Sequence, residues 1–167
     1  MTKNEEFSDT RIFRAAGLVM RDAFPKIKNM EIDIKKTCGH KFLNHVSSCA
    51  EFMKLSYEAD KNDKETKLIY GYAARDCAGM AEVDLQLIVY AELFPGKAKT
   101  SKNGTKTVEK SEYKQFKLGT PEIYKNMGDL ITQIKGWNAS LEEQFDEEKL
   151  KDIKKRAQNI IVNRHLN

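Results

Sequence analysis

The chain has few of the residues that interrupt regular structure, with three prolines and nine glycines among 167 residues. β-Sandwiches, β-barrels, and collagen-like or disordered chains need more turn residues, or fewer apolar residues than the 40% found here. A chain of this length buries one core without disulfides or metal ions. The composition therefore predicts a single, mostly helical domain over residues 1–167.

Cysteine and long hydrophobic runs are also scarce. The three cysteines Cys38, Cys49 and Cys77 form no C-x-x-C motif and fall within apolar helical patterns, so we expect reduced core thiols and no disulfide framework. The longest unbroken apolar stretch is residues 87–91, and the first residues are too acidic for a secretory signal. We therefore expect a soluble, cytoplasmic protein without a membrane partner.

The excess of positive charge is small over the whole chain and large in one segment. Lys and Arg number 29 against 25 Asp and Glu, a formal net charge of +4. Residues 96–120 carry seven lysines and two glutamates, or +5 in 25 residues. The rest of the chain is nearly neutral and depends on local clustering for any second basic surface.

Apolar residues at three- and four-residue intervals predict four helices. The first begins after a cap at Ser8 or Asp9 and ends at Phe24, because proline disfavours helical geometry in the residue before it. The others cover about 31–59, 64–94, and Pro121 to about Leu141. From Phe145 to Ile161 the same spacing continues, as a fifth helix or as an extension of the fourth.

The helix over 64–94 is apolar on more than one face, with small residues at 71–81 followed by bulky ones at 85–94. Such a helix needs more than one neighbour, which indicates the centre of a bundle or a subunit interface. Between this helix and the next, Asn103-Gly104 is a turn signal, so residues 96–120 form either a two-stranded excursion or a mobile loop.

Metal and catalytic motifs are missing. Cys38, His40, His45 and Cys49 are metal-capable types on one helix, but their spacing supplies two ligands at most, and no histidine follows a Glu-x-x-His pattern. Residues 95–100 lack the earlier glycine and the Ser or Thr of a phosphate loop, and there is no Gly-x-Ser-x-Gly elbow. We therefore expect no catalytic residues, no metal, no cofactor and no enzymatic activity.

Basic residues cluster in places that suit phosphate contact. Three arginines share one face of the first helix, four lysines surround the turn that follows it, and further lysines lie in the 96–120 loop. These residues are solvated surface or a nucleic-acid contact, and the loop is a solubilising segment or a nucleic-acid finger. The candidate nucleic-acid-binding residues are Arg11, Arg14, Arg21, Lys26, Lys28, Lys35, Lys36, Lys97, Lys99, Lys102 and Lys106.

Three segments carry a family resemblance. They are Ala-Phe-Pro-Lys at 23–26, Ala-Glu-Val-Asp-Leu-Gln-Leu-Ile-Val-Tyr-Ala-Glu-Leu at 81–93, and Met-Gly-Asp-Leu at 127–130 followed by Lys-Gly-Trp at 135–137. Over residues 10–141 the chain resembles the four-helix-bundle family of the accessory variability determinant (Avd) proteins of diversity-generating retroelements and the 23S rRNA intervening-sequence proteins. The Gly136-Trp137 pair is more like the Avd branch, because the other branch typically has Asn-Ile-Ala-Glu-Gly where residues 45–51 stand here.

The resemblance implies an all-α, antiparallel up-and-down four-helix bundle that assembles into a homopentamer with a basic surface. In the Avd branch this assembly binds the retroelement's reverse transcriptase and its template RNA and supports mutagenic cDNA synthesis without catalytic residues of its own. The alternative is an intervening-sequence-type bundle that acts as a structural or interaction module. The loop at 96–120 and the extension at 145–167 are longer than the family's minimum.

Overall fold

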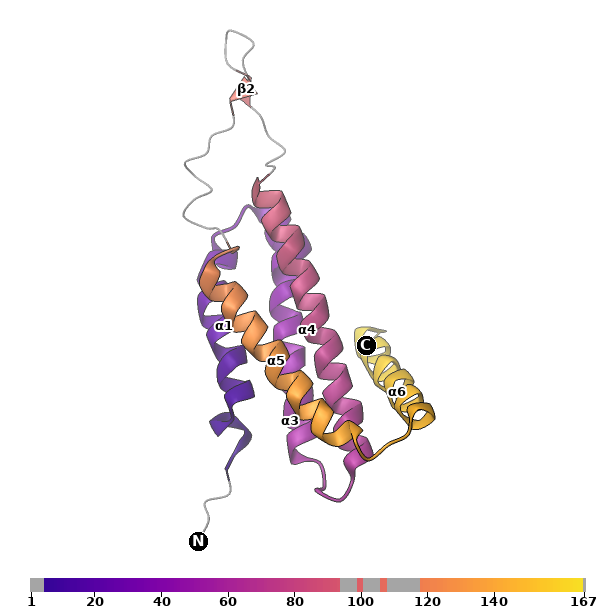
Figure 1. Cartoon of the computed structure of the whole chain (residues 1–167). Helices are drawn as coiled ribbons and strands as arrows, with labels where there is room; N and C mark the ends of the chain where they lie inside the picture. The colour runs from indigo at the N-terminus through magenta and orange to yellow at the C-terminus, as the bar shows by residue number, and fades with distance from the viewer. Residues whose placement is uncertain (1–4, 94–98, 101–105, 108–117, 167) are drawn as a thin grey trace.

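The computed structural model describes residues 5–93, 99–100, 106–107 and 118–166, and these residues form an all-α protein (Figure 1). A short turn, η1 (Phe7–Asp9), precedes the first long helix. The helical elements that follow are α1 (Arg11–Lys28), α2 (Ile32–Ile34), the π-helical turn η2 (Lys35–Gly39), α3 (His40–Glu58), α4 (Lys64–Leu93), α5 (Pro121–Glu142) and α6 (Glu147–Leu166).

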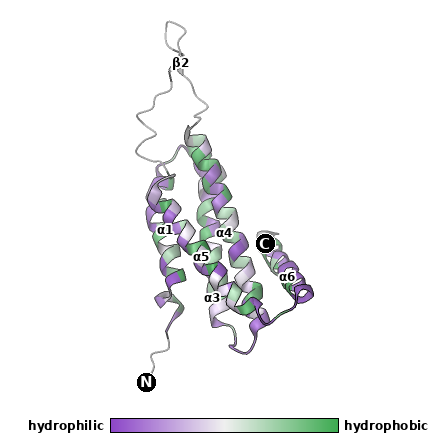
Figure 2. Ribbon diagram, viewed as in Figure 1, coloured by the Kyte–Doolittle hydropathy of each residue, from purple (hydrophilic) through white to green (hydrophobic). Residues whose placement is uncertain are grey.

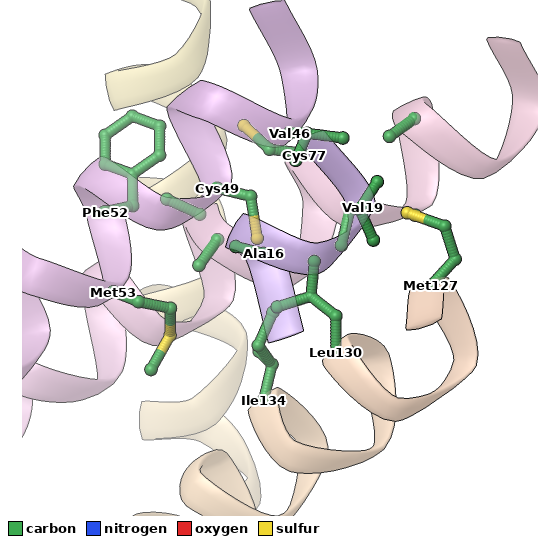
Figure 3. Close-up of a cluster of buried hydrophobic side chains, with 14 of the residues drawn as sticks. Ala16, Val19, Val46, Cys49, Phe52, Met53, Cys77, Met127, Leu130 and Ile134 are labelled. Carbon is green, nitrogen blue, oxygen red and sulfur yellow. The ribbon is translucent and has the colours of Figure 1, made fainter. Parts of the chain in front are cut away.

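The five long helices α1, α3, α4, α5 and α6 all contribute to one hydrophobic core. α3 packs along α4, α1 packs against both α3 and α5, and α5 packs against α4 (Figure 1). Figure 3 shows side chains from these helices meeting in the interior, among them Val19, Val46, Cys49 and Leu130, which are fully buried. The stripes of apolar residues predicted from the sequence therefore face one another across the core.

The first helix is longer than the sequence predicts, because Pro25 does not end it. α1 continues through Pro25 to Lys28. Proline removes one helical hydrogen bond, but Arg21, whose carbonyl loses that partner, is exposed and can be hydrated. Ile27 is 1% exposed, so its burial holds the last turn in place. The predicted end at Phe24 is wrong for this reason.

The second predicted helix is present from Ile32 to Glu58, with a π-helical turn near its start. Gly39 closes that turn against α1, since a Cβ added there would lie 2.9 Å from Cγ2 of Ile27. No larger residue fits this approach without a shift of Ile27. The sequence predicts the extent of the helix but not the π turn.

The third and fourth predicted helices, over 64–94 and from Pro121 to about Leu141, are confirmed. α4 covers the predicted range as far as Leu93, and α5 begins at Pro121 after Thr120, whose Oγ1 accepts a hydrogen bond from the Ile123 amide at 3.4 Å. The apolar spacing from Phe145 to Ile161 belongs to a separate fifth helix and not to an extension of α5. The Lys149 amide donates to Oδ1 of Asp146 at 2.8 Å, so Asp146 caps a new helix, α6.

α6 packs against α4, on the side of α4 away from α1 (Figure 1). Ile153 and Ala157 are fully buried in this contact. Ion pairs hold the helix on both sides, from Arg156 to Glu65 of α4 and from Arg164 to Glu51 of α3. The extension is thus part of the folded unit and not a free tail.

A polar layer crosses the core where α3 ends and α4 begins. The Lys67 ammonium, 7% exposed as a residue, donates to the carbonyls of Ser56 and Tyr57 at 3.0 and 3.1 Å, which satisfies the last turn of α3. Ser56 Oγ donates to the Lys67 carbonyl at 2.6 Å and accepts from Nε1 of Trp137 at 2.8 Å. Trp137 therefore links α5 to both helices.

The cysteines are free, as expected, with Cys49 and Cys77 buried and Cys38 half-buried. Burial raises the pKa of the Cys49 thiol, and it raises that of Cys77 to about 12. Among the described helices, none is both long enough and apolar enough to cross a membrane.

Candidate nucleic-acid interface

The turn after α1 gathers four of the predicted lysines at one end of the molecule, which we call the basic end and define as Lys26, Lys28, Lys35 and Lys36. Lys28 and Lys36 are exposed, and Lys26 and Lys35 are half-buried. Lys26 and Lys28 lie in the last turn of α1, where the negative pole of the helix dipole favours cations. The local fold therefore concentrates positive charge at this end.

One hydrogen bond fixes part of the cluster. The Lys35 ammonium on η2 donates to the carbonyl of Lys28 at 3.2 Å, so a lysine seven residues later caps the end of α1. Asn29 Nδ2 donates to the Pro25 carbonyl at 2.8 Å and closes the same turn. Lys35 is consequently a structural cation, whereas Lys28 and Lys36 present their charge to solvent.

The Lys-rich loop leaves and returns at the same end, because α4 ends and α5 begins there (Figure 1). Lys99 and Lys106 lie in a two-residue antiparallel ladder between β1 (Lys99–Thr100) and β2 (Lys106–Thr107). This ladder agrees with the two-stranded possibility for the four residues that it contains, and residues 96–98, 101–105 and 108–117 lie outside the described part of the chain. Lys97 and Lys102 lie outside the described residues.

Acidic side chains do not cancel the basic end. Glu31 and Asp33 beside η2 and Glu122 at the start of α5 are all exposed, as three acids against the four lysines of the cluster and the neighbouring Lys41. Positive charge is therefore in excess at this end, which is the electrostatic feature expected of a phosphate-binding surface.

The structure does not bring the predicted arginines into this cluster. Arg11 lies 17 residues before Lys28 on α1, which is about 26 Å at 1.5 Å per residue, and Arg14 is only one turn nearer. Arg21 is closer, but its Nε lies 3.1 Å from Oδ1 of the adjacent Asp22. All three arginines are exposed on α1, and only Arg21 approaches the basic end.

The four metal-capable residues of the second predicted helix point in different directions. His40 is exposed, Cys49 is buried, and His45 lies against α4, where its Nδ1 is 2.5 Å from Oδ2 of Asp84. In the described part of the chain, no three His, Cys, Asp or Glu side chains are grouped to hold a metal ion. Core packing is expected for these residues, and Cys49 fulfils it, whereas His40 does not, because its side chain is exposed.

The contact between His45 and Asp84 is a feature that the sequence reasoning missed. Asp84 is 7% exposed and occurs at a core position of α4, between Ala81 and Leu85. A charged residue at a core position requires a partner, and His45 falls at the matching position of α3. That pairing of polar residues on two neighbouring apolar stripes is the signal that could have revealed it.

Comparison with known proteins gives no relative. No family model matches the chain, and no curated protein or solved structure matches it either. Function must therefore be argued from the residues themselves and from the resemblance described above.

Proposed function

We propose that this protein is a non-catalytic nucleic-acid-binding factor, built as an antiparallel up-and-down four-helix bundle whose basic end contacts phosphates. The observation that carries the proposal is the convergence of Lys26, Lys28 and Lys36 with the exit and return of the Lys-rich loop. The lysines of the basic end and those of the β1–β2 ladder would contact the phosphate backbone of the nucleic acid at two separate points.

The remaining surface supports a binding role without catalysis. The largest groove described, between α3, α4 and α6, has the His45–Asp84 pair on its floor but no Ser, Thr, Cys or Tyr among the residues that line it. An imidazole oriented by a carboxylate needs a nucleophile, a metal or a bound substrate group to perform hydrolysis. The described lining supplies no such nucleophile.

The test replaces Lys26, Lys28 and Lys36 together by Glu and measures binding to single-stranded RNA by fluorescence polarisation at several salt concentrations. Lys35 is kept because it caps α1. Each lost phosphate contact should lower the slope of log K against log salt by about 0.7 for a single strand. We expect affinity to fall at least tenfold and the slope to decrease by about 2.

A matched control carries the same charge change elsewhere. Lys61, Lys151 and Lys155 are exposed and lie away from the basic end, so their replacement by Glu should alter affinity no more than about threefold. Equal losses in the two triple variants would show that only net charge matters, and the assignment of the basic end would then be wrong.

The cellular role that we propose is accessory to a reverse transcriptase and its template RNA, as a homopentamer, and it rests on the resemblance to the Avd branch. Such an assembly would have five times the chain mass of 19.2 kDa and a formal charge of about +20. Sedimentation equilibrium tests the assembly. Co-purification from the native host, with identification of bound protein and RNA, tests the partner, and an eluate without a reverse transcriptase would overturn this role.

The structural or interaction module stays the second candidate, because α4 exposes large apolar side chains. Val83 and Leu87 are each 53% exposed, and neither contributes to the basic end. If neither triple variant changes nucleic-acid binding and RNA binding is weak throughout, the protein is better described as such a module.

A further inference from the structure

A groove runs between α3, α4 and the last turns of α6, with a volume of about 940 Å³. Met80 and Val83 of α4 and Ile161 and Val162 of α6 supply its apolar lining. The contact between His45 and Asp84 joins α3 to α4 at its floor. Gly79 opens onto it, since a Cβ added there would meet nothing within 4 Å.

The groove continues an interface that the chain already uses. Positions 69, 72, 76, 80, 83 and 87 follow one another at three- and four-residue intervals and so share one face of α4. The first two, Ile69 and Tyr72, are 5% and 3% exposed in the part of α4 against which α6 packs, whereas Val83 and Leu87 are each 53% exposed. The same stripe is therefore covered at one end and open at the other.

The lengths of the two helices account for the difference. α4 has 30 residues and α6 has 20, which correspond to about 45 and 30 Å. Because α6 starts level with Glu65, through ion pairs from Lys149 and Arg156, it leaves about 15 Å of α4 beyond its end. Figure 2 shows hydrophobic residues, in green, in this part of α4.

We propose that this open half of the groove docks an amphipathic helix of about ten to twelve residues from a partner protein, placed end to end with α6. The packing of α6 shows which side chains suit a helix in this groove. Its apolar side chains, one and two turns apart, are buried against α4, and its charged side chains form ion pairs with α4 and α3 at the edges of that contact. Gly79 allows the backbone of the docked helix to approach α4 closely.

Charge does not select the sign of the partner helix. Lys41 and Arg75 are matched by Asp76 and Asp84 among the lining residues, so the groove has no formal excess of either charge. The apolar side chains of the lining therefore define the partner. Apart from Lys41, which borders both, this groove is a different surface from the basic end, and a helical protein segment is a different class of partner from nucleic acid.

The probe is a synthetic 14-residue helical peptide with leucines at one-turn spacing and glutamates flanking them, labelled for fluorescence polarisation. We expect saturable binding to the full chain and at least tenfold weaker binding after Val83→Gln with Leu87→Gln, whereas a twin peptide that has lysines for glutamates should bind equally well, because the charges of the lining balance. Ile32→Gln with Leu55→Gln is the matched control, because these apolar residues are 60% and 43% exposed elsewhere.

Each outcome decides the proposal. Loss of binding in the groove variant alone, with unchanged RNA affinity and melting temperature, supports it and leaves the proposed function untouched. Absence of saturable binding to the wild type, or equal binding by both double variants, overturns it. If sedimentation shows that the wild type is an oligomer and the groove variant a monomer, a second copy of the chain occupies the groove and the separate partner is wrong.

Discussion

Gly71 of α4 lies where no other residue fits, although it is in the middle of a helix. A Cβ at this position would lie 2.0 Å from Oδ1 and 3.1 Å from Cγ of Asn138, which is 1% exposed on α5. The Asn138 amide donates to the Gly71 carbonyl at 3.1 Å, while its Oδ1 has no hydrogen-bond partner among the described atoms. Replacement by alanine must therefore displace a buried polar side chain.

The expected cost of Gly71→Ala follows from three effects. Overpacking costs about 1 to 3 kcal/mol, and the displaced amide loses a buried hydrogen bond, with a penalty of about 1 to 3 kcal/mol. The higher helix propensity of alanine stabilises the folded state by about 1 kcal/mol and so offsets part of this cost. The net destabilisation should be about 1 to 5 kcal/mol, or a fall of about 3 to 15 °C in melting temperature for a chain of this size.

The measurement is thermal and urea unfolding followed by circular dichroism, with Gly79→Ala as the control on the same helix. Because a Cβ at Gly79 meets nothing within 4 Å, that substitution should stabilise the protein by up to about 1 kcal/mol. The double variant Gly71→Ala with Asn138→Ala should recover at least half of the loss, since it removes both the clash and the orphaned oxygen. A Gly71→Ala protein as stable as the wild type would refute the packing argument.

Three further predictions concern titratable groups. Burial lowers the pKa of Lys67, so the unfolded state binds this proton more tightly. Wild-type stability should therefore rise relative to Lys67→Met as pH increases through the lowered pKa toward the unfolded value of about 10.4, and melting curves with Lys61→Met as the exposed control test this. Hydrogen bonds from Lys149 and Arg156 lower the pKa of Glu65, so its contribution is complete above about pH 4.3 and is lost as pH falls through the lowered value. The protection factors of the α6 amides, which correct for the slower intrinsic exchange in acid, should consequently fall at low pH in the wild type but not in Glu65→Gln. Because their thiols are buried and poorly ionised, Cys49 and Cys77 should react with a thiol reagent only as fast as the protein opens, whereas half-buried Cys38 should react sooner.

Helix positions were predictable because they depend on local spacing. The cap at Thr120 and the stripe through Ile123 and Leu130 lie within one segment, and the structure confirms both. The continuation of α1 past Pro25 was not predictable from local rules, since it depends on burial of Ile27 against Gly39, twelve residues away.

The candidate interface was predictable only in part. The lysines around the first turn lie close in sequence, and the structure keeps them together. Arg11 and Arg14 share a helix face with Arg21, but a shared face does not place residues at the same end of a rod about 27 Å long. The pair of His45 and Asp84 joins residues 39 positions apart, so it required knowledge of which helices are neighbours.

Packing against neighbouring helices explains why α4 has apolar residues on more than one face. A helix that is apolar on more than one face needs several neighbours, and within this chain α3, α5 and α6 supply them. Ala73, Ala78 and Ala81 are at most 1% exposed, so the small residues are used by close packing inside the chain. A subunit interface is therefore not needed to explain that segment. What packing within the described chain leaves unexplained is the segment beyond α6, where Val83 and Leu87 are exposed, and any partner that the composition implies should be sought there.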